Sequence, residues 1–235
     1  MCEFIKKHLL VLIYFLIELI TCILLIFKLV KDVNIFRYSQ VIIDFIASIV
    51  IFIFYKSKKS AYFCVAFFMI CLADYGLVIL GDHYELSVAF FLFAQIALML
   101  MLKIGKIELL IRLIVIVVLE VIAFIICKDL YSPLVILSML YLATFSANII
   151  YAIIKKEHIM FIIGMILYML CDICVGISNF ELFTNEVLID VCAKLIFIFY
   201  IPGLFLMVIG VYLSENRKRH LCKSLKEKNI WKNII

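Results

Sequence analysis

The chain contains eight apolar stretches of about 20 residues each, separated by short polar segments. A helix of that length matches the hydrocarbon thickness of a bilayer, and in lipid a single apolar segment can satisfy its own backbone groups only as a helix. We therefore expect an all-α membrane protein with eight transmembrane helices. The predicted spans are residues 8–27, 39–55, 61–80, 85–102, 107–127, 133–154, 159–178 and 187–213.

The composition excludes an ordinary soluble domain. Hydrophobic residues make up 68% of the 235 positions, whereas a soluble domain is usually about 45–50% apolar. Alternation of polar and apolar residues, which a membrane β-barrel requires, is not visible. The first apolar run is too long for the core of a signal peptide and is not followed by a typical cleavage site, so we expect it to remain as a span.

The lysines and arginines that flank the spans predict an orientation. Sixteen of them fall on the side that holds both chain ends, and four fall on the other side. The positive-inside rule then places both termini in the cytoplasm. We expect two parts, a transmembrane domain (1–213) and a basic cytoplasmic tail (214–235) that lies on anionic lipid headgroups. No nucleic-acid-binding motif accompanies this tail, and the predicted location is the cell membrane.

The cysteines do not predict a metal site or a disulfide framework. Most of the 9 cysteines fall inside predicted spans, where a thiol behaves as a small apolar group. Cys171 and Cys174 form a C-x-x-C pair, but a zinc site needs about four ligands and no second pair with histidines is present. We expect no metal and no cofactor.

Polar residues inside the spans form the list of candidate functional residues. A charged side chain at mid-membrane costs on the order of 2.5–3.5 kcal/mol even on lenient scales, so it usually faces protein or a watery cavity. The intramembrane candidates are Glu18, Asp44, Asp74, Gln95, Arg112, Glu120, Asn148, Asp172, Asp190 and Lys194.

Two of these acids fall at the same depth. Asp74 and Asp172 each follow the predicted cytoplasmic start of their span by about 13 residues, which corresponds to roughly 20 Å of helix. Gly76 and Gly176 lie near them and would let a backbone or a ligand come close. Tyr168 lies one turn below Asp172 and could donate a hydrogen bond to it. The shared depth indicates one buried site that contains both carboxyl groups.

Other members of the list have simpler interpretations. Asp190 and Lys194 are spaced i, i+4 with the acid first, which suits an intrahelical ion pair. Glu18 is interpreted as a protonated packing residue. Arg112 is near enough to the cytoplasmic face to extend its head group into water, and Asn148 is interpreted as a hydrogen-bonding residue between helices.

Three segments resemble signatures of the YhhN-type lysoplasmalogenase family. LADYGLVILGDHYELSVAFFLFAQ (72–95) resembles the first signature, GMILYMLCDICVGISNF (164–180) the second, and YIPGL (200–204) a shorter element. Eight spans with cytoplasmic termini also match the family in outline. The resemblance implies an integral membrane hydrolase that cleaves the vinyl ether of lysoplasmalogens, which releases a fatty aldehyde and a glycerophospho-base.

The resemblance also implies roles for individual residues. Vinyl ethers are acid-labile, so a neutral carboxylic acid and an ionised partner suit the reaction. Asp74 and Asp172 would form this pair, with their separate roles unassigned. The substrate-binding candidates are Gln95, Tyr168, Lys194 and Tyr200. Gln95 and Tyr200 would orient the headgroup or water, and Lys194 would attract the phosphate if it is free of Asp190.

Two other functions remain open. The first is a small secondary transporter or ion-coupled carrier, because Asp74 and Asp172 are 98 residues apart and occupy the same place in each four-span half, as in a parallel repeat. No Gly/Pro interruption of the kind that marks carrier sites is visible, however. The second is a non-catalytic membrane scaffold, in which both aspartates could be replaced by asparagine without functional loss.

Overall fold

The structure is a computed structural model that describes residues 2–26, 33–81, 83–126, 132–179 and 185–232. Every regular element within these ranges is helical. The elements are α1 (Cys2–Ile26), α2 (Val33–Tyr55), α3 (Lys58–Asp74), the π-helical segment η1 (Tyr75–Leu80), α4 (Tyr84–Met101), α5 (Lys106–Ile126), α6 (Pro133–Ile154), α7 (Ile159–Asn179) and α8 (Glu186–Lys232).

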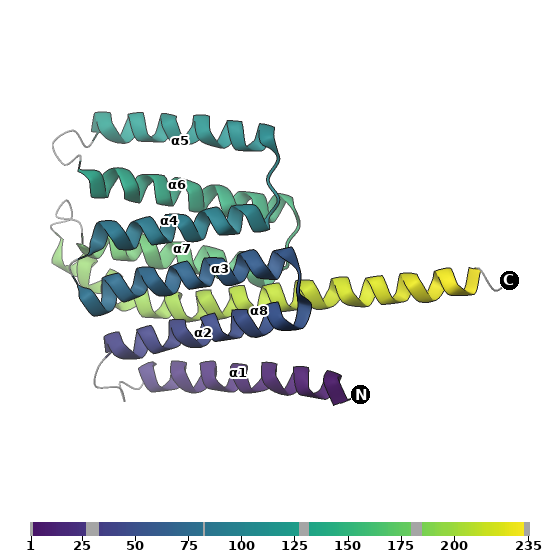
Figure 1. Cartoon of the computed structure of the whole chain (residues 1–235). Coiled ribbons are helices and arrows are strands. Elements are labelled where there is room, and N and C mark those ends of the chain that lie inside the picture. Colours follow the sequence, from purple (N-terminus) through teal and green to yellow (C-terminus); the bar gives the residue numbers. More distant parts are fainter. Residues whose placement is uncertain (1, 27–32, 82, 127–131, 180–184, 233–235) are drawn as a thin grey trace.

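The helices lie side by side with nearly parallel axes and form one bundle (Figure 1). Helices α3, α7 and α8 occupy the middle, while α1 and α5 lie at opposite edges. The main contacts join α7 to α8, α3 to both α2 and α4, and α6 to both α4 and α5. Consecutive helices are connected by short segments and run antiparallel, as the sequence predicts.

Six helices in the described part of the chain are long and apolar enough to cross a membrane. They comprise residues Ile35–Tyr55, Lys58–Leu80, Tyr84–Met101, Pro133–Ile154, Ile159–Asn179 and Glu186–Leu221. In water these helices would expose dozens of large apolar side chains on the outside of the bundle. The protein is therefore a multi-pass membrane protein.

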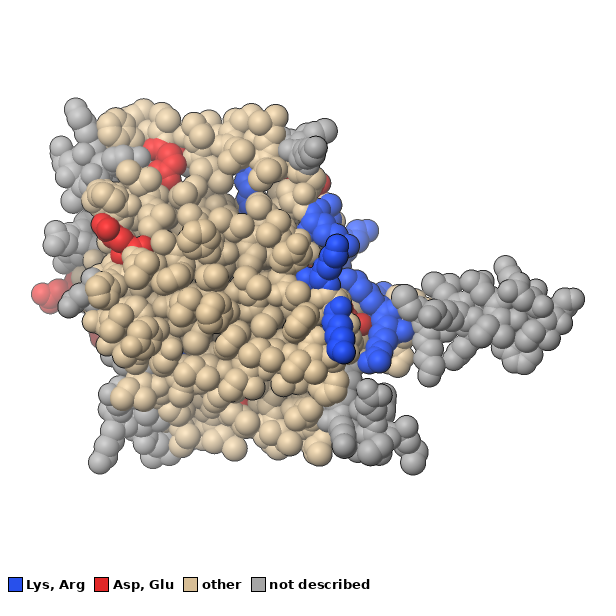
Figure 2. All heavy atoms as spheres, in the orientation of Figure 1, with Lys and Arg blue, Asp and Glu red and all other residues tan. Residues whose placement is uncertain are grey.

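The two ends of the bundle differ in charge. Helix α1 begins and α8 ends at the same end of the bundle (Figure 1). Lysine and arginine side chains gather at this end, and most of the visible acidic side chains lie toward the opposite end (Figure 2). We call the end with the lysines the basic end and the other the acidic end. This distribution is the one that the sequence predicts for a chain with both termini on one side.

Three helix boundaries differ clearly from the predicted ones. The first helix begins at Cys2 and not at residue 8. The second helix begins at Val33 and not at residue 39, so Arg37 lies inside α2 and not in a loop. The last helix continues without a break from Glu186 to Lys232. The boundary predicted between residues 213 and 214 therefore falls inside one helix, and the basic tail continues the last span as a helical extension.

Polar residues at both ends of the bundle define where several helices begin and end. Ser57 forms a capping box with the start of α3, and Ser132 accepts a hydrogen bond from the first turn of α6. Lys56, Lys103 and Lys156 follow the ends of α2, α4 and α6 and have positive φ angles of 47°, 53° and 52°. Lysine at a helix C-terminus interacts favourably with the helix dipole, so these residues contribute both charge and helix termination.

Glycines allow α7 and α8 to pack with their backbones in close contact. A Cβ atom at Gly210 would lie 2.3 Å from the backbone nitrogen of Phe161, and one at Gly164 would lie 2.6 Å from that of Met207. Gly203 is nearly as tight, because its Cβ would lie 3.0 Å from the backbone nitrogen of Tyr168. Small residues that permit such approach are characteristic of helix interfaces in membranes.

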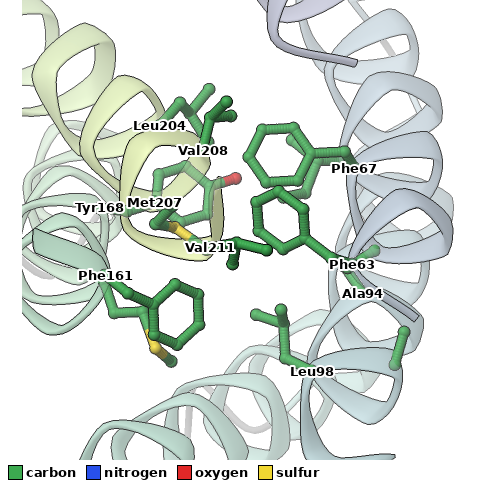
Figure 3. Close-up of a cluster of buried hydrophobic side chains, with 14 of the residues drawn as sticks. Phe63, Phe67, Ala94, Leu98, Phe161, Tyr168, Leu204, Met207, Val208 and Val211 are labelled. Atoms are coloured by element: carbon green, nitrogen blue, oxygen red, sulfur yellow. The ribbon is translucent and has the colours of Figure 1, made fainter. Parts of the chain in front are cut away.

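The centre of the bundle is a cluster of apolar side chains from α3, α4, α7 and α8 (Figure 3). Phe63 and Phe67 from α3 face Met207 and Val211 from α8 across this cluster. Phe63 also contacts Phe161 of α7, with ring centroids 6.4 Å apart. This packing holds α3, α7 and α8 in fixed relation, and these three helices carry Asp74, Asp172 and Tyr200.

Candidate functional site

Asp74 is fully buried at the end of α3 and has two partners from other helices. The guanidinium Nη2 of Arg37, from α2, is 3.1 Å from Asp74 Oδ1. The hydroxyl of Tyr200, from α8, donates to Asp74 Oδ2. The guanidinium carbon of Arg37 also lies 4.3 Å from the centroid of the Tyr200 ring, within the range of a cation–π contact. Three helices are thus joined at one carboxylate.

The helix that carries Asp74 changes its winding directly after this residue. Residues Tyr75–Leu80 form the π-helix η1, and the N–H of Gly81 bonds to the carbonyl of Gly76 at 3.1 Å. Gly81 has a φ of 77° and ends the segment. A Cβ at Gly76 would lie 2.3 Å from Ser87 Oγ of α4, so a larger residue here would force the Ser87 hydroxyl to move. π-helical turns are rare and occur frequently at functional sites.

Asp172, on α7, is half-buried and lies within electrostatic range of both Asp74 and Arg37. Its Oδ2 accepts a hydrogen bond from the hydroxyl of Tyr141 on α6. No ion pair within the described ranges includes Asp172. The two acids therefore belong to one polar cluster, but only Asp74 is paired with a cation.

Aromatic rings fill the space around these acids. The Tyr168 ring lies 5.7 Å from the Tyr200 ring and 5.7 Å from that of Phe145, measured between centroids. Phe91 and Tyr141 are also 5.7 Å apart. The hydroxyl of Tyr168 is buried and finds no hydrogen-bond partner among the residues that the structure describes. The expected bond from Tyr168 to Asp172 is therefore not formed, and Tyr141 donates it instead.

We define the outer cluster as Arg37, Asp74, Tyr141, Tyr168, Asp172 and Tyr200. It contains four of the six residues that the sequence singled out, namely Asp74, Tyr168, Asp172 and Tyr200. The other two have different surroundings. Lys194 is exposed and its Nζ lies 2.5 Å from Asp190 Oδ2, so the condition for a phosphate-binding role is not met.

Gln95 belongs to a separate set of polar residues. Asn148 Nδ2, from α6, donates to both the backbone oxygen and Oε1 of Gln95 at 2.9 Å. Asn148 Oδ1 in turn accepts from Arg112 of α5 at 2.8 Å. The interhelical role predicted for Asn148 is confirmed. The prediction for Arg112 is wrong, because its side chain is buried between α5 and α6 and does not extend into water.

Two residues of the outer cluster were missed from the sequence. Arg37 was counted with the loop charges because the span was started at residue 39, although an arginine four residues inside α2 falls near the depth of Asp74. Nothing in the sequence distinguishes Tyr141 from the other tyrosines. Gly176 was expected to permit a close approach, but a Cβ at this position would meet nothing within 4 Å.

A hollow in the surface lies on another side of the bundle. It has a volume of about 170 Å³ and is lined by apolar residues of α1, α2 and α8, including Tyr14, Ile46 and Val208. Neither Asp74 nor Asp172 lines it. Tyr14, which lines the hollow, donates a hydrogen bond to Asp44. Glu18, four residues further along α1, accepts one from Gln40.

Cys171 and Cys174 lie beside the outer cluster as buried free thiols. Within the described residues, no group of three or more histidine, cysteine or acidic side chains could hold a metal ion.

The chain matches no family model, no curated protein and no solved structure.

Proposed function

We propose that the protein is a membrane hydrolase that cleaves the vinyl ether of lysoplasmalogens with Asp74 and Asp172 as its acid/base pair. The observation that carries this proposal is the unequal environment of two carboxyl groups in one cluster. Asp74 is paired with Arg37, whereas Asp172 is held by a neutral tyrosine hydroxyl. Two carboxyl groups in different surroundings can take opposite roles in one reaction. The resemblance of residues 72–95 and 164–180 to the lysoplasmalogenase signatures supports the same reaction.

The environments also support an assignment of roles. The Arg37 guanidinium favours an ionised Asp74, because an opposite charge stabilises the charged form. The negative charge of Asp74 in turn favours a protonated Asp172. Asp172 is then the general acid, which transfers its proton to the β-carbon of the vinyl ether. Asp74 is the anion that stabilises the resulting oxocarbenium ion.

Water completes the reaction. It adds to the oxocarbenium carbon and loses a proton to the carboxylate of Asp172, which regenerates the acid. The hemiacetal formed in this step transfers its hydroxyl proton to the glyceryl oxygen as the carbon–oxygen bond breaks. The products are the fatty aldehyde and the glycerophospho-base. Glycosidases stabilise a related oxocarbenium ion with two carboxyl groups. The scheme needs no cofactor, and its partners are the one-chain lipid and the surrounding bilayer.

The topology is part of the proposal. We infer eight membrane crossings with both termini in the cytoplasm of a cell-membrane protein. The gathering of lysine and arginine at the basic end supports this orientation (Figure 2). The outer cluster would then lie in the outer half of the bilayer, at the level of the vinyl ether of a lysolipid inserted from that side.

The direct test is hydrolysis of lysoplasmalogen by the purified protein in lipid nanodiscs, with aldehyde release as the readout. Asp172→Asn and Asp74→Asn are each expected to lower turnover on the order of 10²–10⁴-fold, the usual contribution of acid–base catalysis. Asp190→Asn is the matched control, because this acid is exposed and paired with Lys194. Its turnover should equal that of the wild type. Wild-type turnover in either of the first two variants would remove that residue from the mechanism.

An ion-coupled carrier is the second candidate, and the π-helix after Asp74 favours it. Irregular helix segments beside a buried charge are typical of carrier sites, and η1 is such a segment. A carrier predicts substrate uptake into proteoliposomes that depends on Asp74 and yields no aldehyde. Aldehyde release without uptake would reject the carrier and keep the hydrolase.

A further inference from the structure

The network of Gln95, Arg112 and Asn148 contains a buried cation without a counter-ion. We call this network the inner cluster. The Arg112 side chain is only 4% exposed, and its Nη2 donates to the backbone oxygen of Thr144 at 2.6 Å and to Asn148 Oδ1 at 2.8 Å. Both acceptors are neutral. None of the ion pairs in the described part of the chain includes Arg112.

Several donors of the inner cluster are unused. Nε and Nη1 of Arg112 are buried and have no hydrogen-bond partner within the described ranges, and the same is true of Gln95 Nε2. A guanidinium stays protonated in proteins, so Arg112 cannot lower its burial cost by losing a proton. Charged side chains in membrane spans almost always pair with one another or with backbone carbonyls, and they often mark functional sites. Arg112 has one such carbonyl, from Thr144, but two of its nitrogens find no partner among the described residues. The inner cluster therefore lacks a negative partner.

The depth of the inner cluster indicates where this partner comes from. Each of its residues is six positions from the helix end at the basic end of the bundle: Arg112 from Lys106, Asn148 from Ile154 and Gln95 from Met101. Six residues correspond to roughly 9 Å of helix, so in the topology proposed above the inner cluster lies just below the lipid phosphates. Helix α5 lies at the edge of the bundle (Figure 1) and exposes most of its large apolar side chains, so lipid surrounds the helix that carries Arg112.

We propose that Arg112 and Gln95 bind the phosphate group of a phospholipid from the leaflet at the basic end, in a site between α4, α5 and α6. Arginine is suited to phosphate because its planar guanidinium presents several donors at once. The site is distinct from the outer cluster in depth, although α6 contributes Tyr141 to the outer cluster and Asn148 to the inner one. It is an attachment site for a structural lipid and takes no part in the reaction proposed above.

The test is native mass spectrometry of the full chain in detergent, titrated with dioleoylphosphatidylglycerol and, separately, with dioleoylglycerol. The wild type is expected to retain one phosphatidylglycerol and no dioleoylglycerol. Arg112→Gln should weaken lipid retention about tenfold or more, since it removes a charge-assisted interaction. Lys103→Gln removes an exposed positive charge at the same end of the bundle and should retain the lipid like the wild type.

Asn148→Asp keeps the proposal testable if Arg112→Gln does not fold. This substitution places a carboxylate against Arg112 Nη2 without changing the side-chain size. The internal acid should replace the lipid phosphate, so phosphatidylglycerol binding should fall about tenfold while the protein remains folded. If Asn148→Asp binds the lipid as tightly as the wild type, Arg112 is not the binding group.

A thermal-shift arm distinguishes the source of the phosphate. Sodium phosphate is compared with sodium chloride at equal ionic strength. A phosphate-specific rise in the melting temperature that is absent in Arg112→Gln would assign the site to free phosphate. A rise with phosphatidylglycerol alone would assign it to a lipid headgroup. Both results support an anion site, and the proposal is overturned if neither probe acts through Arg112.

Discussion

The outer and inner clusters each contain a buried arginine, but the two arginines differ in what neutralises them. Arg37 contacts the carboxylate of Asp74 and the face of the Tyr200 ring. The acceptors that the structure describes for Arg112 are a backbone carbonyl and an amide oxygen. In the described part of the chain, the arginine of the outer cluster has a carboxylate partner and the arginine of the inner cluster has none. This difference is the basis for our two proposals, in which Arg37 supports the reaction at Asp74 and Arg112 binds an anion from outside the chain.

The strongest test of this comparison is the substitution of each arginine by methionine. Arg37→Met leaves Asp74 buried without its cation and is expected to destabilise the protein by about 3–5 kcal/mol. Arg112→Met leaves no charge unpaired and removes only two bonds to neutral acceptors, so it should cost about 1 kcal/mol in lipid-free detergent. Unfolding by a denaturing detergent, followed by circular dichroism, measures both values.

The double substitution Arg37→Met with Asp74→Asn serves as the control for the first value. It removes both charges together, so it should be less destabilising than Arg37→Met alone. Equal costs for Arg37→Met and Arg112→Met would contradict the comparison, because the two arginines would then be equivalent.

The two acids of the outer cluster also differ in whether a cation neutralises them. The tyrosines that donate hydrogen bonds to them, Tyr200 and Tyr141, can be used to measure this difference. Tyr200→Phe removes a hydrogen bond to an ion-paired carboxylate and should cost about 1.5–3 kcal/mol. Tyr141→Phe removes a bond to a carboxyl group that we expect to be neutral, at about 1 kcal/mol. The same detergent unfolding measures both. A larger loss for Tyr141→Phe would reverse the assignment of the two acids.

The glycine contacts between α7 and α8 test whether the scaffold fixes the outer cluster. Gly210→Ala places a methyl group against the backbone of Phe161 and is expected to destabilise by about 1–3 kcal/mol. It should also lower hydrolysis, because α7 and α8 carry Asp172 and Tyr200. Gly176→Ala is the matched control, since its methyl group enters open space. If Gly176→Ala alone lost activity, hydrolysis would depend on the acidic end of α7 and not on the contact between α7 and α8.

The smallest effect is expected for Glu18→Gln. Glu18 and Asp44 are buried acids on α1 and α2 whose hydrogen-bond partners, Gln40 and Tyr14, are neutral. If Glu18 is a protonated packing residue, an amide of the same shape should change stability by less than about 0.5 kcal/mol. A loss above 2 kcal/mol in the same unfolding measurement would show that Glu18 acts as an anion.

The helical class and the shared site of the two aspartates could be predicted because they depend on length and depth. Apolar runs of bilayer length require helices, and equal distances from the helix starts placed Asp74 and Asp172 together. The direction in which a side chain points depends on the rotation of each helix about its axis. A helix that is apolar all round has no polar face to fix this rotation. Tyr141 was therefore missed. Gln95 lies six residues from the basic end of α4, so its depth alone already separates it from the two aspartates.

The π-helix η1 after Asp74 determines how this part of the chain would respond to a deletion. A π-helix takes up more residues per turn than an α-helix, so η1 holds surplus chain compared with a regular continuation of α3. Shortening residues 75–80 by one position would tighten the winding and rotate everything beyond it, including Gly76 and its contact with Ser87. Asp74 lies before the altered stretch and would keep its orientation. Deletions in this stretch should therefore disturb the acidic end of the bundle but leave the contact between Asp74 and Arg37 intact.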